Sequence, residues 1–228
     1  MRRVLLAPSI LNADFRNLES AISFIQGYAD VVHLDIMDGN FVPNLTFGPM
    51  VVKAVRSITD LPLDVHLMIA QPMEYIEDFR KAGADWISFH VEVARHVGEV
   101  AGAIRRLGAK AGVALSPQTP AHRIKGYADL LDFVLVMTVM PGFGGQKLIP
   151  ESLKKVAEVK ELAASEGRDL PVQVDGGVKF ENLDLVVRSG VDIVVVGSSI
   201  YADADPAAAA ARTRRRLDEL AAADARAE

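Results

Sequence analysis

Two histidines and two aspartates stand at the ends of short apolar runs, where the side chains of an α/β protein can take part in chemistry. His33 and Asp35 are two residues apart, so on a strand their side chains point to the same side. His66 and Asp175 end two further runs. Because burying four unpaired ionisable groups carries a large desolvation cost, we expect these residues to be paired or to bind an ion.

The donor types in this set favour a divalent metal ion. Two neutral imidazoles and two carboxylates suit Zn²⁺, Fe²⁺, Mn²⁺ or Co²⁺, and the residues leave the choice among these ions open. The chain has no cysteine, which excludes thiolate ligands and disulfides. Asp38 lies close by, but Asp38-Gly39 is a turn signal, so we assign this aspartate to structure.

Three glycine-rich segments predict an anion site. They cover residues 141–146, 175–178 and 197–199, and each follows an apolar run and leads towards a helix. Glycines let backbone N–H groups approach a phosphate closely, and helix N-termini add a favourable dipole. Since Lys147 and Lys179 stand just outside these segments, we expect backbone amides to hold most of the phosphate.

Three methionines, Met37, Met68 and Met137, also stand at the ends of apolar runs. Methionine is a flexible filler of hydrophobic cores. The same side chains could instead form a dry lining against the reacting carbons of a substrate. The sequence favours neither interpretation over the other.

The elements that must position these residues are eight short apolar runs separated by segments of helical periodicity. In the clearest runs the apolar character is nearly continuous, which is typical of parallel strands covered on both faces. Eight strand–helix units in 228 residues favour a single-domain (β/α)₈ TIM barrel over a doubly wound sheet. The predicted strands are residues 4–7, 31–35, 63–66, 86–90, 111–115, 133–137, 172–174 and 193–196.

The predicted helices follow these strands, and the segment 121–126 is the weakest of them. The others are residues 14–25, 49–58, 73–81, 97–107, 151–164, 180–187 and an alanine-rich tail from about residue 206 within the one domain 1–228. A glycine-to-aspartate step precedes every second strand, which suggests a fold built from paired units. The aspartates of these steps are Asp30, Asp85, Asp129 and Asp192.

Composition narrows the choice of partners. The net charge is −5 and no basic stripe is present, which argues against a nucleic acid. The one dense basic run, Arg212 with Arg214 to Arg216, is interpreted as a solvated helix face. The N-terminus does not resemble a signal peptide and no run has the length of a membrane span, so we expect a cytoplasmic protein.

Across nearly its whole length the chain resembles the ribulose-phosphate 3-epimerase family. The matching stretches are residues 7–15, 33–49, 63–68, 141–146, 174–178 and 197–198, and residues 37–44 are the most specific of them. The resemblance implies an isomerase of the pentose phosphate pathway that interconverts D-ribulose 5-phosphate and D-xylulose 5-phosphate. It also implies dependence on one divalent metal ion, and it is compatible with a homo-oligomer.

The resemblance assigns roles to individual residues. It implies that His33, Asp35, His66 and Asp175 are metal ligands, with Asp35 as proton acceptor and Asp175 as proton donor. Ser9 and His66 would touch the sugar. The remaining substrate-binding residues would be Gly142, Phe143, Gly144, Gly145, Asp175, Gly176, Gly177, Gly197 and Ser198.

The sequence departs mildly from the family pattern. Asn40, Ser116 and Met140 stand where other residues are more usual, although none is a proposed ligand.

Three other functions are alternatives to this one. The nearest is a D-allulose 6-phosphate 3-epimerase, which uses the same chemistry. A decarboxylase of the phosphate-binding barrel type would need a strand-end lysine that the runs do not supply. A non-catalytic sugar-phosphate-binding barrel would not need the complete set of four polar residues.

Overall fold

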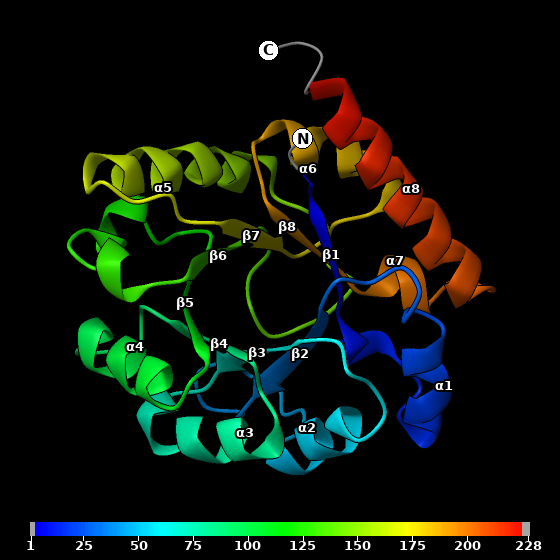
Figure 1. The fold of residues 1–228 in the computed structure, drawn as a ribbon, viewed down its shortest axis with the longest axis horizontal. Coiled ribbons are helices and arrows are strands. Elements are labelled where there is room, and N and C mark those ends of the chain that lie inside the picture. Colours follow the sequence, from blue (N-terminus) through cyan, green and yellow to red (C-terminus); the bar gives the residue numbers. More distant parts are fainter. Residues whose placement is uncertain (1–2, 225–228) are drawn as a thin grey trace.

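Eight parallel strands form one sheet that curls into a nearly closed barrel, as seen in a computed structural model that describes residues 3–224. The strand order is β1-β8-β7-β6-β5-β4-β3-β2. The remaining gap, between β1 and β2, is bridged by a parallel pairing of Ser9 with His33. Figure 1 shows the helices arranged around this barrel. The (β/α)₈ fold predicted from the sequence is confirmed.

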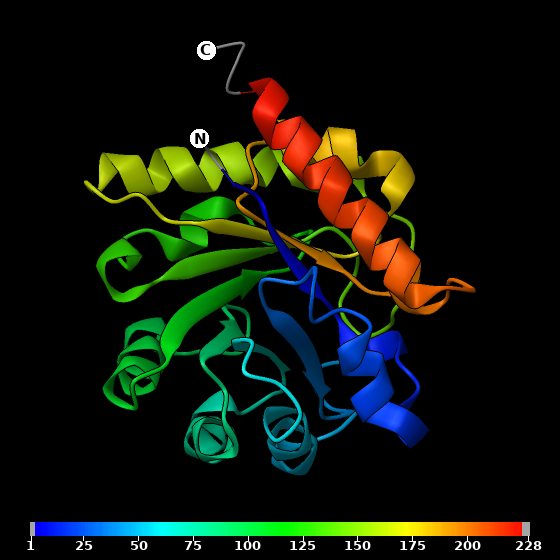
Figure 2. The same ribbon diagram turned by 45° about the vertical axis from the view of Figure 1, so that its right-hand side comes forward.

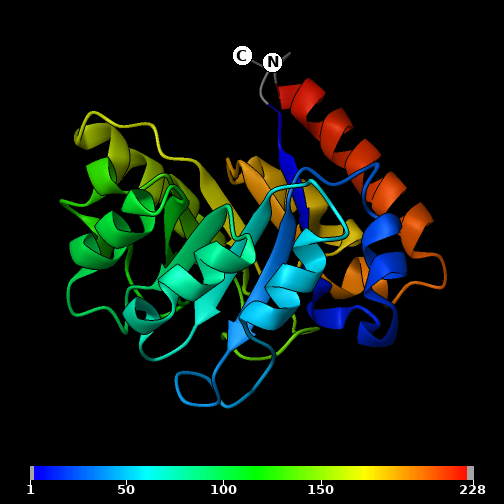
Figure 3. The same cartoon turned by 60° about the horizontal axis from the view of Figure 1, so that its bottom comes forward.

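The strands start where the apolar runs start, to within a residue, and several end later than predicted. β2 and β3 each run two residues further and so include Met37 and Met68. The strands are β1 Leu5–Pro8, β2 Val32–Met37, β3 Leu63–Met68, β4 Trp86–His90, β5 Lys110–Leu115, β6 Phe133–Met137, β7 Val172–Asp175 and β8 Ile193–Val196. In Figure 3 the blue strands run downward, so the loops that follow them gather at the lower side of the barrel.

Helices follow every strand except β5. In the described part of the chain, β5 and β6 are joined by two short 3₁₀ helices, Ala121–Ile124 and Ala128–Leu130. The prediction of a helix at 121–126 was wrong in type and length, because this segment forms only the first of these 3₁₀ helices. The α-helices are α1 Leu18–Ser23, α2 Pro49–Arg56, α3 Ile76–Ala82, α4 Val97–Arg106, α5 Lys154–Ser165, α6 Leu183–Arg188, α7 Ser198–Tyr201 and α8 Pro206–Asp224. Within residues 3–224, none of the helices combines the length and apolar character needed to cross a membrane.

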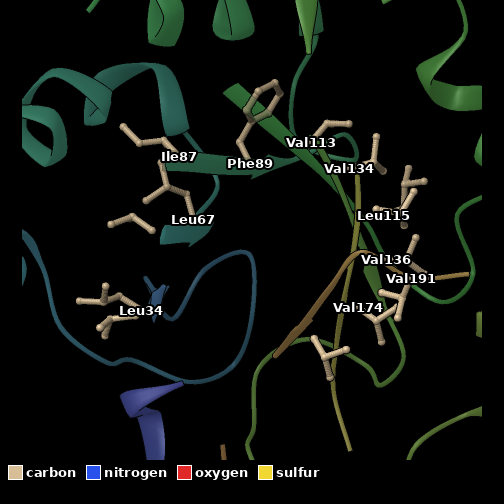
Figure 4. Packing of buried hydrophobic residues seen from close by; sticks show 14 of the residues in the cluster. Leu34, Leu67, Ile87, Phe89, Val113, Leu115, Val134, Val136, Val174 and Val191 are labelled. Carbon is tan, nitrogen blue, oxygen red and sulfur yellow. The ribbon is translucent and has the colours of Figure 1, made fainter. Parts of the chain in front are cut away.

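The two faces of each strand are buried for different reasons. One set of alternating side chains packs against the surrounding helices, and Figure 4 shows Leu34, Leu67, Val113, Val136 and Val174 in this layer. The other set points into the barrel. This double burial explains the continuous apolar runs, and it places the polar residues of β2, β3 and β7 on the inner face.

Helix α8 lies against α6 and α7, on the side of the barrel where β1 lies (Figures 1 and 2). Its basic run is not a uniformly solvated face. Arg214 is buried and pairs with Asp30 and Asp218, and Arg216 pairs with Asp184. The prediction was wrong for Arg214 because this position of the helix faces the start of β2, where Asp30 supplies a carboxylate.

Candidate active site

The four polar residues predicted from the strand ends lie together in the structure. His33 and Asp35 come from β2, His66 from β3 and Asp175 from β7. Each offers one nitrogen or oxygen atom, and these atoms all lie within 4.8 Å of one another. Register contributes to this convergence, because Asp35 pairs with His66 across the β2–β3 ladder. The strand ends therefore assemble a compact cluster of two imidazoles and two carboxylates.

His33 presents a free nitrogen to this cluster. Its Nδ1 lies 2.7 Å from Asp64 Oδ2, while its Nε2 is buried, has no hydrogen-bond partner and lies 3.3 Å from Asp35 Oδ1. Burial by itself lowers the pKa of His33, but the charges of Asp35 and Asp64 outweigh it and raise the pKa well above its usual value. The carboxylates thus favour a positive charge beside this unpartnered nitrogen. A bound cation would supply that charge in place of the ring proton, so the residue fits a metal ligand.

His66 faces the same cluster with its other nitrogen. Its Nδ1 lies 3.3 Å from Asp35 Oδ1 and 3.9 Å from Asp175 Oδ2. Its Nε2 points away and lies 3.0 Å from His90 Nε2. Burial lowers the pKa of His66 to about 4, so the ring is neutral near pH 7, as a metal ligand must be.

The two carboxyl groups of the cluster have opposite tendencies. Burial disfavours the charge on Asp35, but the charge of His33 and the close approach of both imidazole rings hold its pKa far below the usual range. Ser9 Oγ also donates to Asp35 Oδ2 at 2.6 Å. Burial and then the charge of Asp35 raise the pKa of Asp175 well above that of an ordinary carboxyl group. One group is thus suited to accept a proton and the other to donate one.

A cavity opens over this cluster at the ends of the strands. Its lining includes Ser9, Asp35, Asp175 and all three methionines, together with all the glycines predicted to bind substrate, Phe143 and Ser198. His33 and His66 are fully buried and do not form part of this lining. The methionines are themselves buried, so they both fill the core and line the cavity.

Several glycines of the loops are packed closely against neighbouring atoms. Gly177 has a positive φ of 67°, and a Cβ atom there would lie 2.3 Å from the backbone nitrogen of Leu148. A Cβ on Gly144 would lie 2.9 Å from Asn12 Oδ1, and one on Gly197 would lie 3.2 Å from the same atom. Asn12 therefore sits between the two loops, although strand-end spacing gave no reason to select it.

Asp38 has the structural role that its turn signal indicated. Oδ1 accepts hydrogen bonds from the backbone N–H groups of Asn40 and Phe41, and Oδ2 accepts one from Ala70. The carboxylate thereby holds the segment after β2 against the segment after β3. Burial opposes its ionisation, but these hydrogen bonds outweigh that effect and lower the pKa of Asp38.

Four further polar residues surround the cluster, two deeper in the barrel and two at or just after the end of β4. Asp64 and Gln173 stand two residues before His66 and Asp175, and Gln173 Nε2 donates to Asp64 Oδ2 at 2.6 Å. His90 and Glu92 lie behind His66. Counting two residues back along each strand would have found Asp64 and Gln173. His90 ends a predicted strand, so the same strand-end rule could have included it.

Comparisons with known proteins show a family model and relatives that match most of the chain. Residues 5–201 match the family model described as the ribulose-phosphate 3 epimerase family. A ribulose-phosphate 3-epimerase of Bacillus subtilis (strain 168) is 51% identical over 202 residues, covering 88% of this chain and 93% of that relative. One of Escherichia coli (strain K12) is 44% identical over 207 residues, covering 90% and 92%.

Solved structures of lower identity share the fold. A 3-hexulose-6-phosphate synthase superposes with a TM-score of 0.72 at 22% identity, covering 93% of this chain and 99% of that one. A tryptophan synthase α-subunit from Pyrococcus furiosus gives a TM-score of 0.68 at 20% identity, with 96% and 99% covered. At these identities the likeness concerns the barrel alone.

Proposed function

Because the chain belongs to the ribulose-phosphate 3-epimerase family, and is thus an epimerase of the isomerase class, we propose that it interconverts D-ribulose 5-phosphate and D-xylulose 5-phosphate. The observation that carries the proposal is the pair Asp35 and Asp175. They come from β2 and β7, they border one cavity, and their environments drive their pKa values in opposite directions. Inverting a carbon centre by proton transfer needs one group that removes the proton and a second group that returns a proton to the opposite face.

The reaction inverts C3 of a 2-keto sugar phosphate. Asp35, held ionised by the two histidines and oriented by Ser9, accepts the C3 proton. The electron pair left at C3 is delocalised onto the C2 carbonyl oxygen as an enediolate. Asp175, which is protonated more readily, delivers a proton to the opposite face of C3. In the reverse direction the two aspartates exchange roles.

The cluster supports a metal-dependent form of this reaction. His33 Nε2, His66 Nδ1 and one oxygen from each aspartate would hold the ion. When bound, a divalent cation supplies Lewis-acid stabilisation of the negative charge on the sugar oxygens. The histidines also keep the carboxylates at fixed positions, because both rings are fully buried. Zn²⁺, Fe²⁺, Mn²⁺ and Co²⁺ all suit this donor set.

The phosphate would lie at the glycine loops after β6, β7 and β8. Because glycine has no side chain, these loops present backbone groups to the cavity, and Ser198 adds a hydroxyl. Phe143 is largely exposed at the rim. The three methionines would exclude water from the reacting carbons. The cytoplasmic location and a homo-oligomeric state stay predictions.

The experiment compares turnover of two substrates by the purified protein. We expect conversion of D-ribulose 5-phosphate to D-xylulose 5-phosphate, with a kcat/KM above that for D-allulose 6-phosphate. A higher value for the six-carbon substrate would replace the proposed substrate with the hexulose phosphate. Binding of either sugar phosphate without turnover would indicate a non-catalytic sugar-phosphate-binding protein instead.

Metal dependence is tested separately. Treatment with a chelator followed by gel filtration should abolish turnover, and each of Zn²⁺, Fe²⁺, Mn²⁺ and Co²⁺ should be tried for recovery. Full activity in protein shown by elemental analysis to be free of metal would contradict the proposed role of the ion, while leaving the two-aspartate scheme standing.

A further inference from the structure

A chain of polar side chains runs from His66 away from the cavity and ends at Glu92. His66 Nε2 lies 3.0 Å from His90 Nε2, and His90 Nδ1 lies 3.0 Å from Glu92 Oε2. Both histidines are fully buried. Neither His90 nor Glu92 touches the cavity, so the proposed reaction does not use them directly.

Glu92 can only accept hydrogen bonds. Its Oε1 accepts from the backbone N–H of Ser116 at 2.9 Å and from the hydroxyl of Thr119. Burial by itself raises the pKa of Glu92, but its hydrogen bonds to His90, Thr119 and Ser116 outweigh this and lower it to about 2. The group is therefore ionised near pH 7, and its Oε2 faces a His90 nitrogen that must carry the proton.

The donor and acceptor roles then follow one after another. With a proton on Nδ1, a neutral His90 offers a lone pair at Nε2. His66 must therefore donate from its own Nε2, because two acceptors 3.0 Å apart would repel. A neutral His66 protonated at Nε2 has a lone pair at Nδ1, the atom that faces Asp35 and Asp175.

We propose that His90 and Glu92 are positioning residues that fix the tautomer of His66, so that its Nδ1 lone pair points at the proposed metal site. The inference rests on that site. It gives His66 the same kind of support that Asp64 gives His33, through two side chains instead of one. Partners of this kind orient histidine ligands and strengthen their binding of metal.

Glu92 also holds the loop after β5, so the test must distinguish the loss of these loop contacts from the loss of its contact with His90. Its Oε1 holds residues 116 and 119 of the loop after β5. Lys155 Nζ holds the same loop independently by donating to the carbonyl oxygens of Ser116 and Pro117 at 2.6 and 2.8 Å. Thr119→Val removes one loop contact and leaves the Glu92–His90 contact in place, so it serves as the matched control.

Glu92→Gln is the most informative variant. The glutamine oxygen should turn to the N–H of Ser116, which leaves the amide NH₂ facing His90 Nδ1. His90 would then carry its proton at Nε2, and His66 would be forced to protonate Nδ1, the atom needed for the metal. We expect the Zn²⁺ affinity, measured by competition with a chromophoric chelator, to fall about 10–100-fold, with less than about a threefold change in Thr119→Val.

A second pair of variants keeps the test decisive if Glu92→Gln does not fold. His90→Gln can place its side-chain oxygen near the position of Nε2 and accept from His66, whereas His90→Leu cannot. We expect His90→Gln to retain most of the wild-type Zn²⁺ affinity and His90→Leu to lose about 10–100-fold. Equal affinities in these two variants, or unchanged affinity in folded Glu92→Gln, would overturn the inference.

The tautomers themselves can be observed by ¹⁵N NMR of the Zn²⁺-loaded wild-type protein. The expected spectrum shows His66 protonated at Nε2 only and His90 at Nδ1 only. A proton on His66 Nδ1, or on both nitrogens of His90, would contradict the proposal. Failure of the wild-type protein to bind Zn²⁺ at all would instead refute the metal site on which the proposal rests, so the two failures are distinguishable.

Discussion

At the scale of single residues, the two aspartates of the cluster differ in environment more than in chemistry. Asp35 lies between two histidines and accepts from Ser9, so its charged form is favoured. Asp175 lies near the same histidines but is largely withdrawn from solvent and faces the charge of Asp35, so its neutral form is favoured. Two identical side chains thereby become a base and an acid, which is how one fold can carry out both steps of an epimerisation.

Asp175→Asn should nearly stop turnover in both directions, because the amide cannot supply or remove a proton at C3. Loss of one general acid–base group typically costs about 10²–10⁴-fold in rate. We expect kcat to fall by that amount in steady-state assays run from each substrate. Asp129→Asn, which changes a surface carboxylate, is the control. Turnover of Asp175→Asn within about tenfold of wild type would contradict the assignment.

The sequence predicts the cluster but not its supports. His33, Asp35, His66 and Asp175 were found because parallel strands end at one edge and residues two apart share a face. The partners of the histidines depend on which nitrogen each ring turns inward, and that is decided by contacts between strands. The Asp64–His33 and His90–His66 contacts are of this kind. Spacing along one strand can select Asp64 and His90, but it does not show which ring nitrogen each of them contacts.

At the scale of elements, an aspartate at the start of every second strand ties neighbouring strands together. Asp85 accepts from the N–H of Leu63, and Asp192 accepts from that of Val172. Asp30 and Asp132 do the same for Leu6 and Ala111. Each of these carboxylates also pairs with an arginine or lysine. The contact therefore recurs at every second strand, while a barrel built from paired strand–helix units stays a prediction.

The third aspartate of this repeat was assigned wrongly from the sequence. The step Gly126 to Asp129 suggested Asp129, but its side chain is largely exposed and Asp132 makes the contact. The reason is the short 3₁₀ helix Ala128–Leu130, which delays the start of β6. A local helical turn of three residues is too short to produce a periodic signal.

Asp132→Ala should therefore destabilise the protein much more than Asp129→Ala. Removing the Asp132 carboxylate leaves the buried N–H of Ala111 without its side-chain partner, a loss of about 1–3 kcal/mol. Removing Asp129 affects a surface pair, and such changes stay within about 0.5 kcal/mol. Chemical denaturation of both variants measures the difference in the free energy of unfolding. Equal destabilisation would show that the tie between β5 and β6 is not the contact seen here.

At the scale of the whole molecule, the barrel is least continuous between β1 and β2, the two edge strands of the sheet. Two backbone contacts span this gap: the bridge between Ser9 and His33, both of which stand at the candidate active site, and a hydrogen bond from the N–H of Asp30 to the carbonyl oxygen of Leu6. Helix α8 supports this side through Arg214, whose Nη1 lies 3.0 Å from Asp30 Oδ2. Asp30 in turn accepts from the N–H of Leu6 in β1. Helix α8 thus stabilises the junction between β1 and β2, where Ser9 and His33 of the candidate active site lie.

Arg214→Met should weaken this junction while the neighbouring Arg215→Met should not. Arg215 is exposed, whereas Arg214 is buried and pairs with two carboxylates. We expect a loss of about 2 kcal/mol for Arg214→Met, less than for a fully buried pair because Asp30 keeps Arg3 and Leu6 as donors. Thermal unfolding of both variants gives the comparison. Equal melting temperatures for Arg214→Met and Arg215→Met would show that α8 does not stabilise the junction between β1 and β2 through Arg214.

The central claim is that two opposed carboxyl groups exchange the C3 proton, and turnover in heavy water tests it most directly. NMR of the sugar phosphates after reaction in D₂O reports the hydrogen isotope at C3. The account predicts deuterium at C3 of the D-xylulose 5-phosphate formed, and loss of this incorporation in Asp175→Asn. Product that keeps the original hydrogen at C3 would contradict the proton-exchange mechanism.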